Sequence, residues 1–241
     1  MVFASKLFQA SYDAGKRFFS TPLIQTLATP GPVGVMVPIR SLGPAHAERI
    51  AAHLRALSPA DRYMRFGYAA SDEVIDRYVA SLNFARDDIF GIYNRWLDLI
   101  AVAHLAFAVE SDFSSCAEFG VSVLAHARGR GYGTRLFDRA VMHARNEGVE
   151  MMFIHALSEN TAMLNIAHKA GALVERDGAE SDAYLRLMPA DLDSRITEMV
   201  EEQAAQTDYR LKVQAHQFWG FLHLLQEVRR GVREARDRMP M

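Results

Sequence analysis

The chain has 241 residues, of which 50% are hydrophobic and 23% are charged, and its formal net charge is -2 at pH 7. This composition provides a substantial hydrophobic core without metals or disulfides, and the charge balance argues against binding to nucleic acid or to an anionic membrane surface. Cys116 is the single cysteine, which excludes a disulfide within the chain and suits a reducing, cytoplasmic compartment, and no apolar run approaches the roughly 20 residues that span a bilayer.

The first segment, MVFASKLFQASYDAGKRFFSTP, predicts an amphipathic helix over residues 3–20. It carries Lys6, Lys16 and Arg17 against the single acid Asp13, with phenylalanines and leucine at helical spacing. Organelle transit peptides have a similar composition and periodicity. The segment is therefore interpreted either as a helix that covers the domain or as a targeting segment. The proline-containing stretch that follows predicts a linker, and residues 1–32 are therefore expected to form an N-terminal helix and linker.

Residues 33–188 alternate strand and helix patterns. Ser71 precedes an acidic first turn as an N-cap, and only Arg95 and Trp96 separate two strand patterns, as in a hairpin. In chain order we predict a strand over 33–40, helices over 43–58 and 71–82, strands over 88–94, 97–110 and 116–126, a helix over 131–146, a strand over 149–158, a helix over 160–170 that Gly171 ends, and two closing strands within 172–178 and 183–189.

Residues 189–241 carry no strand signal and predict a helical C-terminal extension. The pattern favours two helices, an acidic one over 190–206 and a second over 208–238 that ends in several arginines, and antiparallel packing would place these charges near each other. The extension is expected to pack on its own domain or to form a homodimer. Glu234 and Asp237 lie among the arginines, so a solvated helix end is favoured over an RNA site.

The stretch HARGRGYGTRL, residues 126–136, places Gly129, Gly131 and Gly133 between a predicted strand and a predicted helix. The first N–H groups of a helix have no helical acceptors and glycine lacks a Cβ, so such a turn can bind an anion. The Walker loop requires Gly-Lys-Ser/Thr and the dinucleotide fingerprint requires G-x-G-x-x-G, and neither fits this spacing. A tight turn without a ligand is the alternative.

Two segments resemble the GNAT superfamily of acyl-CoA-dependent N-acetyltransferases. RGRGYG, Arg128 to Gly133, resembles the R/Q-x-x-G-x-G/A loop of that family, and ENTAMLNIAHKAGA resembles its second cofactor segment, with Asn160 followed eleven residues later by Gly171. The resemblance covers residues 33–188. Upstream, LSPADRYMRFGYAASDEVIDRY is similar to a stretch of the bacterial protein-lysine acetyltransferases that modify acyl-CoA synthetases.

The resemblance implies an α/β fold with a GNAT-like mixed, mostly antiparallel central sheet flanked by helices, here with an N-terminal helix and a helical C-terminal extension. It implies acetyl-CoA as co-substrate, with its pyrophosphate held by backbone amides of the loop. The pantetheine arm would lie along the strand Val121, Val123 and Leu124 and contact Asn160, which also suits an N-cap. The implied loop residues are Arg128, Gly129, Arg130, Gly131, Tyr132, Gly133 and Thr134, the last adding a hydroxyl.

The resemblance also implies direct attack of a neutral amine, from a small molecule or a protein lysine, on the thioester. A general base must take the proton of the ammonium, and Glu118 is the leading candidate because it lies on the strand that leads to the loop. Glu110 and His104 are further candidates. An acyl-cysteine route through Cys116 is disfavoured because no convincing histidine partner is near it in sequence.

One residue departs from the family pattern. Many members place a tyrosine seven residues after the asparagine, as the acid for the departing thiolate, and this chain has Ala167 there. His168 is adjacent but points about 100° away around a helix. Tyr132 or water is then the acid, or no acid is needed. The absent tyrosine also leaves open an acyl-CoA-binding sensor with little catalysis.

Overall fold

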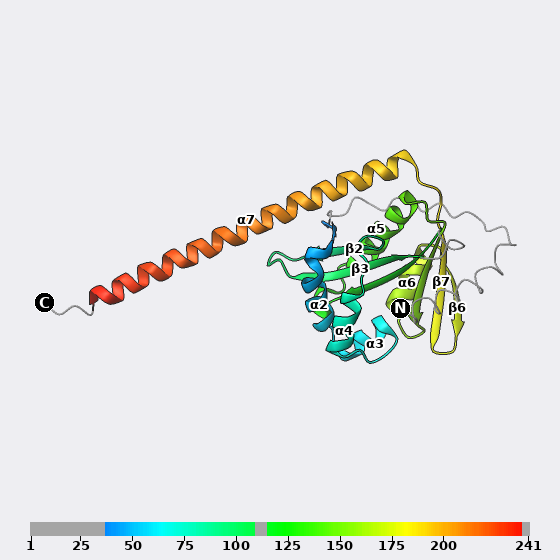
Figure 1. The fold of residues 1–241 in the computed structure, drawn as a ribbon, viewed down its shortest axis with the longest axis horizontal. Coiled ribbons are helices and arrows are strands. Elements are labelled where there is room, and N and C mark those ends of the chain that lie inside the picture. The colour runs from blue at the N-terminus through cyan, green and yellow to red at the C-terminus, as the bar shows by residue number, and fades with distance from the viewer. Residues whose placement is uncertain (1–36, 109–114, 238–241) are drawn as a thin grey trace.

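The computed structural model describes residues 37–108 and 115–237 (Figure 1). The predicted helix over 3–20, the linker and Glu110 lie outside the described residues. The short 3-10 helix η1 (Pro44–His46) and helices α2 (Ala47–Arg55) and α4 (Asp72–Ala80) confirm the two helices expected before the first hairpin.

Helix α3 (Pro59–Phe66) is not among the predicted elements, although the sequence carries its start and stop signals. The Ser58 hydroxyl oxygen accepts the backbone N–H of Asp61 at 3.2 Å, and Pro59 occupies the first helical position. Gly67 ends the helix with a φ of +77°, in the left-handed region that favours glycine. Three strong local signals therefore frame a helix that contains only eight residues.

A seven-stranded sheet forms the centre of the domain, in the order β1-β2-β3-β4-β5-β7-β6. Its strands are β1 (Arg40–Ser41), β2 (Asp88–Tyr93), β3 (Leu99–Phe107), β4 (Cys116–Val123), β5 (Met151–Leu157), β6 (Leu173–Asp177) and β7 (Glu180–Arg186). Only β4 and β5 pair in parallel, which confirms the mixed, mostly antiparallel sheet.

The strand predicted over 33–40 is wrong over its described part, because residues 37–39 are irregular and β1 has only two residues. Pro38 has no backbone N–H to donate to a neighbouring strand, which limits pairing here. The strand predicted over 116–126 ends at Val123, and the 3-10 helix η3 (Ala125–Ala127) follows it.

Helices cover the two faces of the sheet differently. Helix α5 (Tyr132–Asn146) packs on β2, β3 and β4, and α6 (Thr161–Lys169) packs on β5, β6 and β7. Phe119 of β4 meets Phe137 of α5 edge to face, with ring centroids 5.1 Å apart. Since successive side chains of a strand point to opposite faces, Gly120 lies on the other face, where it contacts Arg65 of α3. We call this second face, covered by α2, α3 and α4, the α3 face.

The C-terminal extension is one helix, α7 (Leu192–Asp237), of 46 residues, so the prediction of two antiparallel helices is wrong. Residues 190–219 contain neither glycine nor proline, and nothing interrupts the helical hydrogen bonds between the two predicted segments. At ~1.5 Å per residue the helix is roughly 70 Å long, and Figure 1 shows it projecting from the domain. The acidic start and the arginine-rich end are therefore far apart within one chain.

The first half of α7 docks on the domain through polar contacts. His143 of α5 contacts Glu198, and Arg139 of α5 lies 3.3 Å from both Glu198 and Glu202. In the part of the chain that the structure describes, no helix is long and apolar enough to cross a membrane. The division of the chain at residues 32 and 188 stays a prediction.

Candidate active site

A gap opens between β4 and β5 halfway along β4. The two strands pair only at Cys116 with Met151, Ala117 with Met152 and Glu118 with Phe153, although both continue beyond these residues. The sheet therefore splits after Glu118, and the second half of β4 has a free edge towards β5.

The backbone of β4 presents alternate residues to this gap. The Leu124 N–H donates to the Ile100 carbonyl at 3.0 Å, which places Leu124 at a hydrogen-bonded position against β3. In an antiparallel pair these positions alternate, so every second residue turns its N–H and C=O away from the partner strand. By this alternation the backbone groups of Phe119, Val121 and Val123 face the gap, where an extended amide-containing chain can bind them as an added strand does.

This geometry corrects one predicted cofactor contact. Val121 and the Val123 N–H present backbone groups to the gap, whereas the Val123 carbonyl accepts from Arg128 Nε at 3.1 Å. Leu124 presents none, because its N–H is bonded to Ile100 and its carbonyl accepts the Ala127 N–H at 2.8 Å. The Leu124 side chain is buried in the core. Leu124 is therefore removed from the predicted backbone contacts to pantetheine.

The glycine loop joins β4 to α5 at the open end of the gap. Gly129 has a φ of +75° and Gly131 a φ of +76°, and a Cβ at either position would meet nothing within 4 Å. These two glycines are required by the backbone conformation rather than by crowding. Gly133 differs, because a Cβ there would lie 3.3 Å from Ile166 Cδ1, and its absence lets α5 approach α6.

The start of α5 is suited to bind an anion. The Arg135 N–H donates to the Gly131 carbonyl at 3.0 Å as the first helical bond, so the preceding N–H groups of Tyr132, Gly133 and Thr134 have no helical acceptors. The first turn contains no acidic side chain, and the helix dipole adds positive potential at this end. The gap along β4 thus leads to a phosphate-binding type of turn.

Arg128 ties this loop to α3. Its Nη2 lies 2.6 Å from Asp61 Oδ1, and its Nε donates to the Val123 carbonyl at 3.1 Å. Burial raises the pKa of Asp61, but hydrogen bonds from Ser58 and Arg128 outweigh this effect, and the pKa lies below its ordinary value. The Arg128 side chain therefore positions the loop, whereas Arg130 is exposed beside it.

Asn160 is the N-cap of α6, as the sequence predicts. Its Oδ1 accepts the Met163 N–H at 3.2 Å, and no described residue uses its Nδ2 group. Seven residues further along α6, Ala167 is completely buried on the side of the helix that faces the core. His168 is exposed on a different side of the helix. Neither residue supplies the phenol that the family pattern places here.

Glu118 lies at the last paired position of β4, where the gap begins. Its register partners are Ala106 on β3 and Phe153 on β5, and its side chain is partly exposed on the α3 face. The strand alternation that places Phe119 against α5 therefore places the Glu118 carboxylate where an acceptor can approach from the α3 side. Of the candidate bases named from the sequence, Glu118 is the one whose carboxylate lies where the gap begins and where an acceptor can approach.

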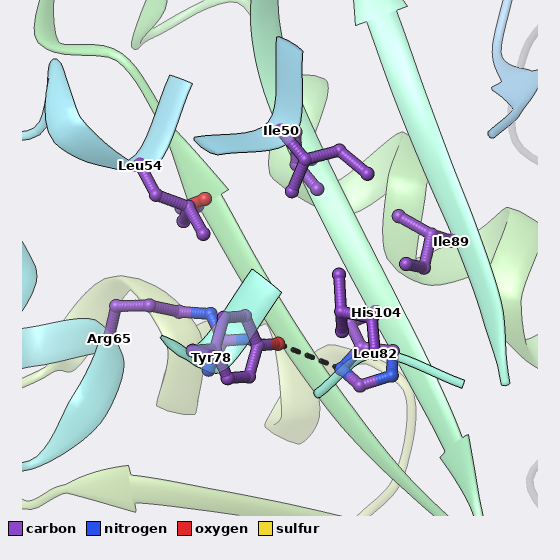
Figure 2. Close-up of a pocket in the computed structure, with 9 residues that line it drawn as sticks. Ile50, Leu54, Arg65, Tyr78, Leu82, Ile89 and His104 are labelled. Carbon is purple, nitrogen blue, oxygen red and sulfur yellow. Dashed lines mark hydrogen bonds between the residues drawn. The ribbon is translucent and has the colours of Figure 1, made fainter. Parts of the chain in front are cut away.

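A chain of polar side chains lies on the same face as Glu118, whose charge acts on Tyr78. Figure 2 shows three members of the chain, Arg65, Tyr78 and His104. Arg65 Nη2 donates to Tyr78 Oη at 3.1 Å, and Tyr78 Oη lies 2.8 Å from His104 Nδ1. Arginine only donates, so the tyrosine oxygen accepts from Arg65 and donates its own proton to His104. Burial is the main cause that raises the pKa of Tyr78. His104 is thus part of this chain, and its Nδ1 is already occupied.

Asp87 completes the chain beneath His104. Its Oδ2 lies 3.4 Å from His104 Nε2, outside hydrogen-bonding geometry. Arg86 contacts both carboxylate oxygens, at 2.6 Å and 2.8 Å. Burial alone would raise the pKa of Asp87, but His104 and Arg86 outweigh it and hold the pKa at about 2. The Asp87 carboxylate is therefore ionised and buried, and it lies next to the His104 ring.

A small cavity lies against Tyr78 and His104 (Figure 2). Its volume is about 10 Å³, and Ile50, Leu54 and Ile89 are among the apolar side chains that line it. A cavity of this size holds one water molecule at most. The cavity is thus too small for a substrate, and the polar side chains beside it form a packed wall of the site.

His155 on the β5 wall of the gap pairs with a carboxylate of the neighbouring strand β7, and neither residue is predicted from the sequence. His155 Nδ1 lies 2.5 Å from Asp182 Oδ1 of β7, and its Nε2 lies 3.7 Å from Glu180 Oε2. The hydrogen bond to Asp182 is the main cause that raises the pKa of His155. No sequence motif joins these residues, because their contact depends on the pairing of β5 with β7.

Cys116 is poorly suited to covalent catalysis. It is buried, with 5% exposure, and burial raises the pKa of its thiol. Because the thiolate is the nucleophile, a raised pKa lowers its reactivity. Among the described residues, no group of histidine, cysteine and carboxylate side chains is arranged to hold a metal ion.

Comparisons with known proteins agree with this geometry. The model of the "Acetyltransferase (GNAT) family" matches residues 56–172. Among curated proteins, none matches the chain. The GNAT domain of S. lividans PAT is similar in structure, with a TM-score of 0.54 and 19% identity over 64% of this chain and 95% of that chain.

Two ligand-bound structures share the fold. The yncA structure from Salmonella typhimurium with acetyl-CoA has a TM-score of 0.51 and 16% identity over 64% of this chain and 96% of that one. Spermidine N-acetyltransferase from Vibrio cholerae with CoA and spermine has a TM-score of 0.50 and 15% identity over 63% and 95%. The chain is thus similar to acyl-CoA-dependent N-acetyltransferases of the GNAT family, by the family model over residues 56–172 and by its fold.

Proposed function

We propose that the protein transfers the acetyl group of acetyl-CoA to a primary amine. The observation that carries this proposal is the gap between β4 and β5, which exposes the backbone of Val121 and Val123 and ends at the N-terminus of α5. Pantetheine would bind along that edge and accept a hydrogen bond from Asn160 Nδ2. The pyrophosphate would bind the amides of the loop from Arg128 to Thr134.

In this reaction Glu118 takes a proton from the acceptor ammonium, directly or through water. The neutral nitrogen then attacks the thioester carbonyl carbon, a C–N bond forms, and the nitrogen loses its second proton to water. The C–S bond breaks to release CoA, whose thiolate takes up a proton. The position of Glu118 at the apex of the gap supports this role, since it faces the α3 side while the donor lies along the backbone edge.

The acceptor is proposed as a protein lysine or a small amine. The protein-lysine reading is supported by the sequence from residue 57 to residue 78, which forms α3 and most of α4 beside Glu118. A polyamine is the alternative, since the similar Vibrio cholerae enzyme is a spermidine N-acetyltransferase. The decisive screen therefore includes acyl-CoA synthetases, spermidine and simple primary amines.

The test has two stages. Calorimetric titration should show acetyl-CoA binding to the full chain, and thiol release should then accompany turnover on at least one acceptor. Absence of binding with acetyl-CoA and with longer acyl-CoAs would overturn the proposal. Binding without turnover on the whole panel would instead favour an acyl-CoA sensor, a reading that the buried Ala167 supports.

We also propose that α7 mediates a homodimer. Its first half exposes large apolar side chains beyond the contacts with α5, and each is at least 59% exposed: Leu192, Ile196, Met199, Val200 and Leu211. Such exposed apolar surface favours association with another surface. Light scattering after size exclusion should give a dimer for the full chain and a monomer for a chain that ends at Leu187, before α7 begins, with equal acetyl-CoA binding. Two monomers would overturn the dimer alone.

A further inference from the structure

His155 stands across the gap from the second half of β4. In the parallel register Glu118 lies opposite Phe153, so Gly120 and His155 would be the next pair on the same face if the strands stayed together. They separate instead, and His155 becomes part of the β5 wall of the gap. Its side chain is 28% exposed, so it is accessible from the α3 face.

The environment of His155 is strongly acidic. Asp182 and Glu180 face it from β7, and Glu118 adds negative potential from β4. Helix α3 also packs against β5, but its charged groups have other partners. Asp61 pairs with Arg128, Arg62 pairs with Asp72, and Arg65 donates to Tyr78, while Tyr63 is exposed. The net effect raises the pKa of His155 and favours the imidazolium form.

The reaction requires a proton donor for the departing thiolate in the gap beside Glu118. The departing thiolate must be protonated, and the α6 position that would supply a phenol is the buried Ala167. Tyr78 is a poor replacement because its proton is directed to His104 Nδ1. Tyr132, the acid named from the sequence, is the first residue of α5 at the loop end of the gap and packs against the core. His155 is a partly exposed proton donor on the β5 wall, on the same face as Glu118.

We propose that His155, held by Asp182, is the general acid that protonates the thiolate of CoA. This inference rests on the proposed function. The acceptor ammonium loses two protons, one to Glu118 on the β4 wall before attack and one to water after the C–N bond forms. His155 on the β5 wall gives one proton to the sulfur as the C–S bond breaks. The products are the amide, CoA thiol and one proton released to water. A proton returns through water from Glu118 to His155, so the enzyme ends the cycle in its starting form.

Asp182 is a positioning residue in this scheme, because it acts through His155. Its carboxylate binds Nδ1 and leaves Nε2 without a hydrogen-bond partner among the described residues, 3.7 Å from Glu180 of the same strand, β7. This arrangement separates the two protonation states that the reaction needs, with a carboxylate base and an imidazolium acid on opposite walls.

The test compares single-turnover rates of the full chain and of His155→Gln between pH 6 and pH 10, with saturating acetyl-CoA and amine. The acid must be protonated, so the wild-type rate should fall as pH rises through the raised pKa of His155. His155→Gln should be about 10²-fold slower near pH 7.5 and should lack this high-pH limb. Asp182→Asn should move the limb to lower pH, because the histidine loses its anionic partner.

His168→Gln, an exposed histidine on α6, is the matched control and should leave the profile unchanged. The inference is overturned if His155→Gln matches the wild type, or if it slows the reaction equally at every pH, as a structural role would. Acetyl-CoA affinity and thermal unfolding of each variant show that it is folded, and Asp182→Asn gives an independent reading if His155→Gln is unstable. A wild-type chain that neither binds acetyl-CoA nor turns over would instead overturn the proposed function, and this inference with it.

Discussion

The two sides of β4 are built in different ways, although they belong to the same eight residues. The edge that faces the gap offers backbone groups, and it continues directly into the glycine loop and the start of α5. The α3 face offers side chains brought together from α3, α4, β3, β5 and β7. One side is therefore encoded by a short segment and the other by tertiary contacts.

This difference bears on how the two substrates are recognised. Backbone groups of an open strand edge and of a helix N-terminus bind amides and phosphates whatever the side chains are. Side-chain networks depend on the identity of every member. The donor side is thus expected to tolerate variation in sequence around its glycines, whereas the acceptor side can change specificity through single residues. The predictions below test whether the two sides can be separated.

The largest expected effect is the fall in kcat caused by the Glu118→Gln substitution. The amide cannot take the proton of the acceptor ammonium, so kcat should fall by about 10²-fold. The donor edge keeps its backbone groups, so calorimetry should give an unchanged Kd for acetyl-CoA. An unchanged kcat would remove Glu118 as the base, and a weakened Kd of similar size would show that the two sides of β4 are not separable.

The ion pairs of His143 serve as a reference, because they are also formed by a histidine and carboxylates but lie away from the gap. The His143→Gln substitution removes them. His143 contacts Glu198 of α7 and lies 2.8 Å from Asp88 Oδ2. Burial lowers the pKa of His143, but these two carboxylates outweigh it and raise the pKa to about 9. The variant should lose about 2 kcal/mol of unfolding free energy, because a partly buried charged hydrogen bond is removed, with kcat and the Kd for acetyl-CoA unchanged.

The pH dependence of that loss follows from the direction of the shift. The folded pKa of His143 lies above the ordinary 6.5, so its contribution is complete below pH 6.5 and is lost as pH rises through about 9. Glu198 has a pKa near 2, since His143 and Asn146 outweigh the effect of burial, so its contribution is lost as pH falls below 4.5. Thermal unfolding should therefore separate wild type and variant most between pH 4.5 and pH 6.5. A difference that persists at pH 10 would contradict this assignment.

The same contrast explains what the sequence predicts and what it does not. The glycine loop and its two flanking elements are local, so their positions and the N-cap role of Asn160 follow from residue order alone. The seven-stranded sheet follows from periodicity and turn signals, apart from β1, where Pro38 limits pairing. Helix α3 carries readable signals in Ser58, Pro59 and Gly67 that the sequence analysis passes over.

The remaining site residues require the fold. His155 and Asp182 are 27 residues apart and meet because β7, not β6, pairs with β5. His104 is recognisable as a polar residue in an apolar strand, but its contact with Tyr78 depends on the packing of α4 over β3. The continuous helix α7 follows from the absence of a helix breaker, although the change from acidic to basic composition favoured a break there.

Gly131→Ala tests the donor side without touching the acceptor face. A residue with a Cβ at a φ of +76° is strained by about 1–2 kcal/mol, so the loop should leave the conformation that presents its amides. We expect acetyl-CoA to bind about tenfold more weakly, with the acceptor KM unchanged at saturating acetyl-CoA. Gly43→Ala is the matched control, because a Cβ there meets nothing within 4 Å and the φ is -101°. Equal loss in both variants would mean that the loop conformation has no special role.

The smallest expected effect is on Tyr78→Phe, which tests the acceptor face alone. Loss of the hydroxyl removes the acceptor for Arg65 and the donor for His104, so the guanidinium that lies against Gly120 loses its anchor. We expect the acceptor KM to rise about threefold, because positioning is lost and the base is retained, while calorimetry gives an unchanged Kd for acetyl-CoA. Tyr68→Phe, whose parent side chain is 51% exposed, should change neither value. If Tyr78→Phe weakened acetyl-CoA and left the acceptor KM alone, the polar chain would belong to the donor side, and the separation between the edge and the face of β4 would be wrong.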